Sequence, residues 1–231
     1  MIRKIAAERL IANDYKVSRV FIFMRGAGSW FSRKDSKERV IAFTDAIIAF
    51  AITLLVLSFS VEQIGKGGTD EASILKGIMH QLPTLASFVI SFFVIAAFWQ
   101  GHVFLCNTAK RFDRVFSQIN LIFVLLIVFL PFTTDMHGEY SHSKIVVSIY
   151  VANIAFAFLA LGILFGYILR KKDFLAQEGA KEQIARSFRK DIGVGLLLLA
   201  STPILFAGEM FAQNYWIAII AIVIIGTRLI K

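Results

Sequence analysis

Six apolar stretches constrain the fold of this chain more than any other feature. They cover about 40–61, 82–101, 116–134, 145–169, 193–209 and 215–230. Roughly 20 apolar residues in a helix span the hydrocarbon core of a bilayer. Because 57% of the residues are hydrophobic, the sequence predicts an all-α integral membrane protein with six transmembrane helices. The last two stretches are short, and Pro203 is expected to kink the fifth.

The basic residues lie almost entirely on one side of these stretches. Of the 25 Lys and Arg residues, 22 precede the first stretch, lie in segments 102–115 and 170–192, or lie at the C-terminal end of the chain (Arg228 and Lys231). The opposite side holds only Lys66, Lys76 and Lys144. The positive-inside rule therefore predicts that both termini are cytoplasmic. Segment 170–191 mixes acids and bases at helical spacings and is interpreted as a solvated helical linker.

Two regions follow from this pattern. Residues 1–38 are predicted to form a basic amphipathic segment at the cytoplasmic interface, where anionic lipid is the expected partner. Residues 39–231 form a six-helix transmembrane domain. The net charge of +9 is explained by the Lys and Arg residues gathered on the predicted cytoplasmic side of the membrane, so nucleic acid is not an expected partner. A single cysteine excludes an intrachain disulfide.

The first apolar stretch presents one side with a distinct composition. With Phe50 at the origin and about 100° per residue, Thr53, Leu54 and Leu57 lie within about 60° of it, while Asp45 lies roughly 140° away. This stripe either packs against other helices or lipid, or faces copies of itself around a pore, where apolar rings gate by dewetting. Composition alone does not decide between the two.

The start of this stretch resembles a known signature. Arg39-x-x-x-Phe43-Thr44-Asp45 is similar to the RxxxFSD motif of the transmembrane protein 175 family, the potassium channels of lysosomes and their prokaryotic relatives; Thr44 replaces the signature serine. The resemblance covers roughly residues 39–231. Later positions that agree with the family pattern are Phe98, Trp99, His102, Asn120 and Pro131-Phe132-Thr133.

The resemblance implies a function and a pore. It implies a modestly potassium-selective cation channel, in which the first helices of a homotetramer surround the axis. Phe50, Leu54 and Leu57 would form hydrophobic rings that act as the gate, and Thr53 would form the hydroxyl ring associated with potassium preference. The permeant potassium ion is the only ligand implied, with no cofactor and no bound metal. The single-repeat form implies a prokaryotic plasma membrane.

Polar side chains of the first three stretches are expected at one depth. Asp45, Trp99 and Asn120 lie near the cytoplasmic ends of their stretches, as do Arg39 and His102. A carboxylate in a low-dielectric setting needs a hydrogen-bond donor, and the indole, imidazole and amide can supply one. We expect this cluster to hold the subunit together; titration of His102 is a further hypothesis.

Other functions are less well supported by the sequence. There is no P-loop motif, no Ser/His/Asp or HExxH arrangement and no Thr-Val-Gly-Tyr-Gly filter, so an enzyme is not expected. A proton-linked secondary transporter using Asp45 and His102 and a non-conducting scaffold remain alternatives. The neighbouring acids and histidines of segment 135–142 lack a defined ligand spacing and are interpreted as a solvated loop.

Overall fold

The computed structural model describes residues 36–59, 64, 68, 70–176, 179–207 and 221, and the regular structure in these ranges is helical. The helices are α2 (Ser36–Leu54), the 3₁₀-helix η2 (Leu55–Ser58), α4 (Glu71–His80), α5 (Leu82–Thr108), α6 (Arg114–Glu139), α7 (Lys144–Arg170), η3 (Lys172–Phe174), α8 (Ala180–Ser201) and η4 (Thr202–Phe206).

Four helical segments are long and apolar enough to cross a membrane. They are Lys37–Ser58, Leu82–Thr108, Arg114–Glu139 and Lys144–Arg170, and they match the first four predicted stretches. The chain is therefore a multi-pass, all-helical membrane protein. The predicted sixth stretch and almost all of the N-terminal segment lie outside the described residues.

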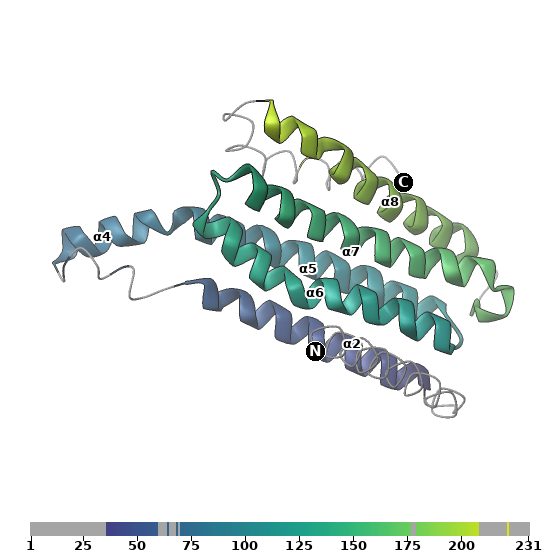
Figure 1. The fold of residues 1–231 in the computed structure, drawn as a ribbon. Coiled ribbons are helices and arrows are strands. Elements are labelled where there is room, and N and C mark those ends of the chain that lie inside the picture. The colour runs from purple at the N-terminus through teal and green to yellow at the C-terminus, as the bar shows by residue number, and fades with distance from the viewer. Residues whose placement is uncertain are drawn as a thin grey trace, which may run out of the picture.

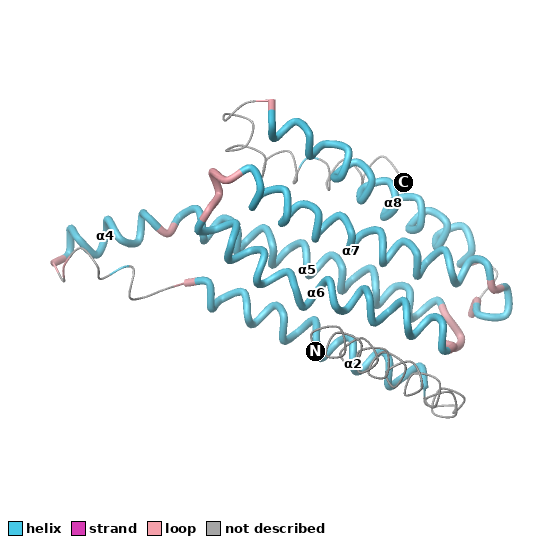
Figure 2. Tube along the Cα trace, viewed as in Figure 1, coloured by secondary structure: helices cyan, strands magenta, loops and turns pink. Residues whose placement is uncertain are grey.

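The long helices form a bundle with α2 at one edge and α8 at the other (Figure 1). Helix α2 packs against α6 and α5, α6 packs against α7, and α7 packs against α8. Short loops join α5 to α6 and α6 to α7, so neighbouring helices run antiparallel (Figure 2). Asp113 starts α6 by accepting a hydrogen bond from the Phe116 amide at 2.9 Å.

An aromatic layer fills the middle of the bundle. Phe98 is fully buried, and its ring lies 4.5 Å from that of Phe158 and 6.0 Å from that of Phe123, measured between centroids. These rings come from α5, α6 and α7, so the layer joins three helices. Aromatic pairs at such separations add to the stabilisation that burial alone provides.

Glycines bring α7 and α8 close together. A Cβ atom on Gly162 would lie 2.8 Å from the Ile192 side chain, and one on Gly195 would lie 2.9 Å from the Ala155 carbonyl oxygen. Small residues at helix contacts let backbones approach closely in membrane proteins. Larger residues at these two positions would push the helices apart.

Three features differ from the sequence prediction. Helix α4 forms between the first two predicted stretches, where the sequence had not indicated a helix, and it projects away from the bundle (Figure 1). Helix α6 continues to Glu139, past the predicted end at 134. The predicted linker at 170–191 is helical from Ala180 as expected, but it is not solvated throughout, because α8 buries Ile184 and Asp191.

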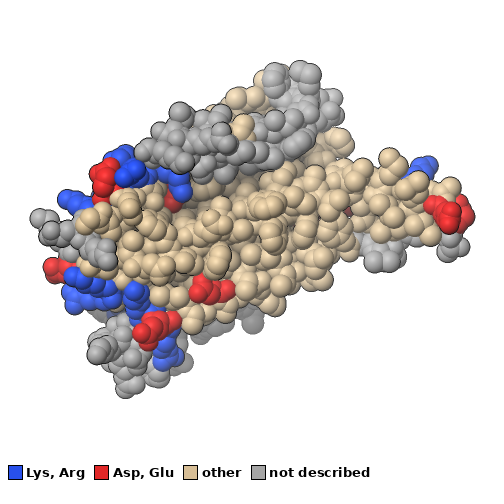
Figure 3. Space-filling model, turned by 180° about the vertical axis from the view of Figure 1, so that it is seen from behind, with Lys and Arg blue, Asp and Glu red and all other residues tan. Residues whose placement is uncertain are grey.

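Lys and Arg side chains gather at one end of the bundle (Figure 3). We call this the basic end; it comprises the starts of α2, α6 and α8 and the ends of α5 and α7. The opposite end, from which α4 projects, has few basic residues in the described ranges. The charge sorting seen in the sequence therefore corresponds to a sorting in space, as the positive-inside rule requires of a spanning bundle.

Candidate functional site

Helix α2 has two faces of different character. Its buried face consists of Thr44, Ile48, Ala51 and Leu55, spaced by four, three and four residues, and none of them exceeds 1% exposure. This spacing is that of one side of an α-helix. The buried face packs against α5 and α6 and fixes the rotation of α2 about its own axis.

The opposite face of α2 is directed away from the bundle. Phe50 is 64% exposed and Leu57 is 73% exposed, and Thr53 between them is also exposed. Phe43, two turns before Phe50 on this side, is 48% exposed, whereas Leu54 is half-buried. We call Phe43, Phe50, Thr53 and Leu57 the open face of α2. The structure thus separates Leu54 from the other predicted pore residues.

The helix changes its geometry along the open face. The α-helix ends at Leu54 and continues as the 3₁₀-helix η2, with about 3.0 residues per turn in place of 3.6. The Thr53 hydroxyl donates to the Phe50 carbonyl at 2.8 Å. This bond uses the hydroxyl proton and leaves the oxygen lone pairs available on the open face.

Behind α2, a buried chain of hydrogen bonds joins three helices. The Asn120 amide donates to the Thr44 hydroxyl at 2.8 Å, and the distance between Asn120 Oδ1 and His102 Nε2 is 3.0 Å. His102 and Thr44 are fully buried and Asn120 is 1% exposed. Because Asn120 Oδ1 can only accept, His102 donates from Nε2. Its Nδ1 then faces the Cys106 thiol at 3.6 Å, so neutral His102 is satisfied on both ring nitrogens.

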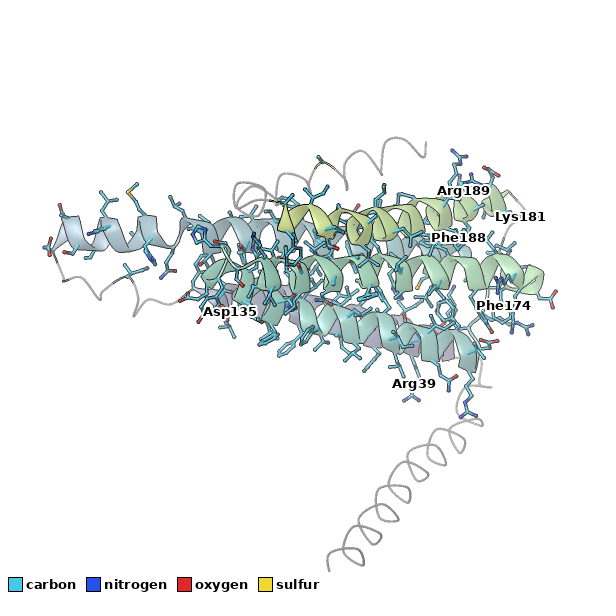
Figure 4. The ribbon with its side chains drawn as sticks, turned by 45° about the horizontal axis from the view of Figure 1, so that its top comes forward. Arg39, Asp135, Phe174, Lys181, Phe188 and Arg189 are labelled. Carbon is cyan, nitrogen blue, oxygen red and sulfur yellow. The ribbon has the colours of Figure 1, made fainter. Side chains whose placement is uncertain are left out.

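The predicted polar cluster therefore divides into separate parts. Trp99 Nε1 donates to Asp45 Oδ1 at 3.1 Å, nearer the surface, without contact to the buried chain. His102 bonds Asn120, and Asn120 bonds Thr44; neither bonds the carboxylate, although the sequence had suggested that they would. Arg39 is exposed on the outside of α2, and in Figure 4 its side chain points away from the bundle.

A second set of buried hydrogen bonds lies in the other half of the bundle. The Thr134 hydroxyl donates to Ser91 Oγ at 2.7 Å, and Ser91 Oγ lies 2.8 Å from the Tyr150 hydroxyl. Ser87 Oγ lies 2.8 Å from His137 Nδ1. We call these five residues the distal polar group. Sequence reasoning missed it, although isolated hydroxyl residues in apolar stretches were the available signal.

His137 is not in a solvated loop, as the sequence had suggested. It lies in the last turn of α6 and is 6% exposed. Within the described residues, no group of three His, Cys, Asp or Glu side chains is arranged to hold a metal ion.

Hydrogen bonds at the basic end tie the loops together and hold the start of α2. Lys37 Nζ donates to the Ala109 carbonyl at 2.6 Å. The segment that contains Ala109 pairs with the segment that follows α7, through Lys110 N to the Phe174 carbonyl at 2.7 Å. We call these bonds, together with those of Asp113 described next, the clasp.

Asp113 is the centre of the clasp. Its Oδ2 accepts hydrogen bonds from the Tyr167 hydroxyl and from Lys171 Nζ, each at 2.6 Å. Burial alone would raise the pKa of Asp113, but the hydrogen bonds from Lys171, the Phe116 amide and Tyr167 outweigh it and lower that pKa. The bond to Asp113 in turn raises the pKa of Lys171.

Comparisons with known proteins agree with the resemblance seen in the sequence. Residues 39–131 match the family model described as "Endosomal/lysosomal potassium channel TMEM175". A protein named as a potassium channel from Streptomyces collinus is 35% identical over 135 residues, which are 55% of this chain and 63% of that protein. Another from Chamaesiphon minutus is 29% identical over 172 residues, 70% of this chain and 81% of that protein.

The fold is also similar to a solved structure. The crystal structure of a lysosomal potassium-selective channel TMEM175 homolog from Chamaesiphon minutus superposes with a TM-score of 0.69 at 20% identity, covering 84% of this chain and 99% of that one. At this identity the match establishes the fold. The family resemblance carried by the signature at 39–45 is therefore confirmed by a sequence model and by relatives.

Proposed function

We propose, from the family match over residues 39–131, that this chain is a potassium-selective cation channel whose pore is lined by the open face of α2 from four subunits. The observation that carries the proposal is the asymmetry of α2. One face is fully buried, while Phe50 and Leu57 on the other are 64% and 73% exposed in the isolated chain. The names of the bacterial relatives support potassium as the permeant ion.

The open face combines two functions in this proposal. Rings of Phe50 and Leu57 form apolar constrictions, where loss of water closes the pore until the radius increases. Thr53 lies between them. Its hydroxyl oxygen can replace part of the hydration shell of a cation while the hydroxyl still donates its hydrogen bond to the Phe50 carbonyl. Four such oxygens are fewer than a carbonyl filter offers, so modest selectivity is expected. Leu54, half-buried, supports the ring beside Thr53.

The buried chain supports this pore from behind. Asn120, held in turn by His102, bonds Thr44, and Trp99 bonds Asp45, so these two signature residues fix the position of α2 without entering the pore. We place the basic end and both termini in the cytoplasm of a prokaryotic cell, with residues 1–38 on anionic lipid. No cofactor enters this mechanism.

A flux assay tests the proposed function. Purified protein in liposomes is expected to pass potassium faster than sodium, and Thr53→Trp is expected to abolish flux because four indoles would fill the pore. Leu125→Trp is the matched control, since Leu125 is 65% exposed on α6 but is not on the open face. Intact tetramers that pass neither ion, or flux that survives Thr53→Trp, would contradict the proposal.

A further inference from the structure

One buried carboxyl group has no role in the proposed pore. Asp191 lies in the middle of α8 and is 1% exposed. Its two carboxyl oxygens are the only buried side-chain nitrogen or oxygen atoms in the described residues that lack a hydrogen-bond partner. It shares a stripe with Ile184, Val194 and Leu198, all of which are buried. A titratable group thus occupies a position that would suit an apolar residue.

Tight contacts between α7 and α8 lie on both sides of Asp191. One turn before it, a Cβ atom on Gly166 would lie 2.9 Å from the Phe188 ring. Directly after it, Ile192 lies where a Cβ atom on Gly162 would approach it to 2.8 Å. One turn later, a Cβ atom on Gly195 would lie 2.8 Å from Leu159 and 2.9 Å from the Ala155 carbonyl oxygen. Asp191 is therefore enclosed between α7 and α8 among these tight contacts.

The charged and titratable groups around Asp191 offer little compensation. On α8, Lys190 Nζ forms an ion pair with Asp191 Oδ1 at 3.3 Å, and the Lys190 side chain is 30% exposed. The other basic groups of α8 nearby, Arg186 and Arg189, lie 3.8 and 3.4 Å from Glu182. Figure 4 shows Arg189 at the outer surface of α8.

Helices α7 and α5, which pack against α8, add no charge opposite Asp191. On α7, the titratable group nearest in register is Tyr167, and its hydroxyl donates to Asp113 at 2.6 Å. On α5, it is His102, which is bonded to Asn120. Helix η4 carries no titratable group. Among the described residues, only the adjacent, partly exposed Lys190 would balance a desolvated carboxylate here.

Burial without hydrogen bonds disfavours the charged form of a carboxyl group much more than its neutral form. We propose that Asp191 is a proton-binding site in the α7–α8 contact. The neutral carboxyl fits the close packing, and release of the proton as the pH rises loosens α8 from α7. The ligand is the proton itself, and no other reactant is needed. The site lies across the bundle from α2, so the proposal does not depend on the pore.

Infrared spectroscopy of the protein in liposomes tests this directly. The wild type is expected to show the carbonyl-stretch band of a protonated carboxylic acid, which is lost as the pH is raised and is absent in Asp191→Asn. Asp113→Asn is the matched control, because Asp113 is paired with Lys171 and should leave the band unchanged. A band that Asp191→Asn leaves intact, or no band at any pH at which the protein is folded, would overturn the proposal.

A second variant keeps the test valid if Asp191→Asn does not fold. Lys190→Gln removes the nearest positive charge, so the band should persist to higher pH than in the wild type. An unchanged pH of disappearance would contradict the placement of the carboxyl beside Lys190. If Asp191→Asn folds, its thermal stability should equal that of the wild type at low pH and exceed that of the wild type at high pH. A variant equally destabilised throughout would contradict the proposal.

Discussion

The two sets of buried hydrogen bonds differ in whether they reach α2. The chain near the basic end includes Thr44, which belongs to α2, whereas the distal polar group joins only α5, α6 and α7. The clasp adds the bond from Lys37 to Ala109 at the basic end. Beyond Asp45, no side chain of the described part of α2 and η2 bonds to another helix; contacts there are apolar, as for buried Leu55. Helix α2 is thus fixed by directional bonds at one end only.

This comparison indicates which part of α2 can move in the proposed pore at the lowest cost in free energy. Apolar contacts are not directional and tolerate sliding, while a buried hydrogen bond lost without replacement costs about 1–3 kcal/mol. Opening by displacement of the distal part of α2, where Phe50, Thr53 and Leu57 lie, therefore preserves the buried chain. The four predictions below, from the largest expected effect to the smallest, test this difference between the two ends.

The largest effect is expected at Phe50. Phe50→Ala shortens the side chain of a proposed apolar ring and widens the constriction, so potassium leak into liposomes should rise several-fold. Phe132→Ala is the control, because Phe132 is 54% exposed on α6 outside the open face. Conductance that is unchanged or lower in Phe50→Ala would count against a pore-facing phenylalanine.

Removal of Asn120 should affect both stability and flux. Asn120→Leu leaves the Nε2 proton of His102 and the Thr44 hydroxyl without their partner, at a cost of about 1–3 kcal/mol for each group. The melting temperature of the reconstituted protein should fall, and α2 should lose its fixed position. Ser91→Ala in the distal polar group should lower stability while potassium flux stays close to that of the wild type. Equal effects of the two variants on flux would remove the proposed difference between the ends.

Thr53 should control selectivity more than conductance. Thr53→Ala removes the hydroxyl oxygen, so the reversal potential under potassium and sodium gradients should shift towards the value for a non-selective pore. Thr53→Ser keeps the hydroxyl and should preserve the preference. An unaltered reversal potential in Thr53→Ala would exclude this side chain from selectivity.

The smallest effect is expected from the clasp. The pKa of Asp113 is lowered in the folded protein, so its stabilising contribution is present above the ordinary value of 3.8 and is lost as the pH falls below it. Asp113→Asn should lower the melting temperature slightly at neutral pH, and the difference from the wild type should disappear in acid. The effect is small because the Lys171 and Asp113 side chains are 42% and 30% exposed, and solvent screens them. A difference in melting temperature that grows in acid would contradict this prediction, because it would mean that protonation of Asp113 does not remove its stabilising contribution.

Apolar length and charge sorting were sufficient to predict the first four membrane-crossing helices, because both follow from the cost of burying backbone and charge in lipid. The helical wheel also predicted the orientation of Phe50 and Thr53 away from Asp45. It could not predict the 3₁₀ segment after Leu54, since that change depends on packing. Nor could it show that Leu54 is half-buried.

The partners of the polar side chains were harder to predict than their depth. His102 and Asn120 were expected to donate hydrogen bonds to the Asp45 carboxylate. Instead they bond each other, and Asn120 also bonds Thr44. Depth follows from sequence position, whereas the choice of partner depends on helix rotation, which one sequence does not reveal. For the same reason Asp191 was taken for a solvated residue of a linker. The roles of these residues in conduction remain predictions.

Cysteine accessibility along α2 tests the central claim most directly. In a Cys106→Ala background, single cysteines would replace Phe50, Thr53 and Leu57 on the open face, and Ile48 and Leu55 on the buried face. If the open face lines the pore, a thiol-reactive cation should block potassium flux through the first three variants and leave the last two unaffected. Block of the buried-face variants, or no block at the open face, would mean that α2 presents its open face to lipid or to a neighbouring helix and does not line the pore.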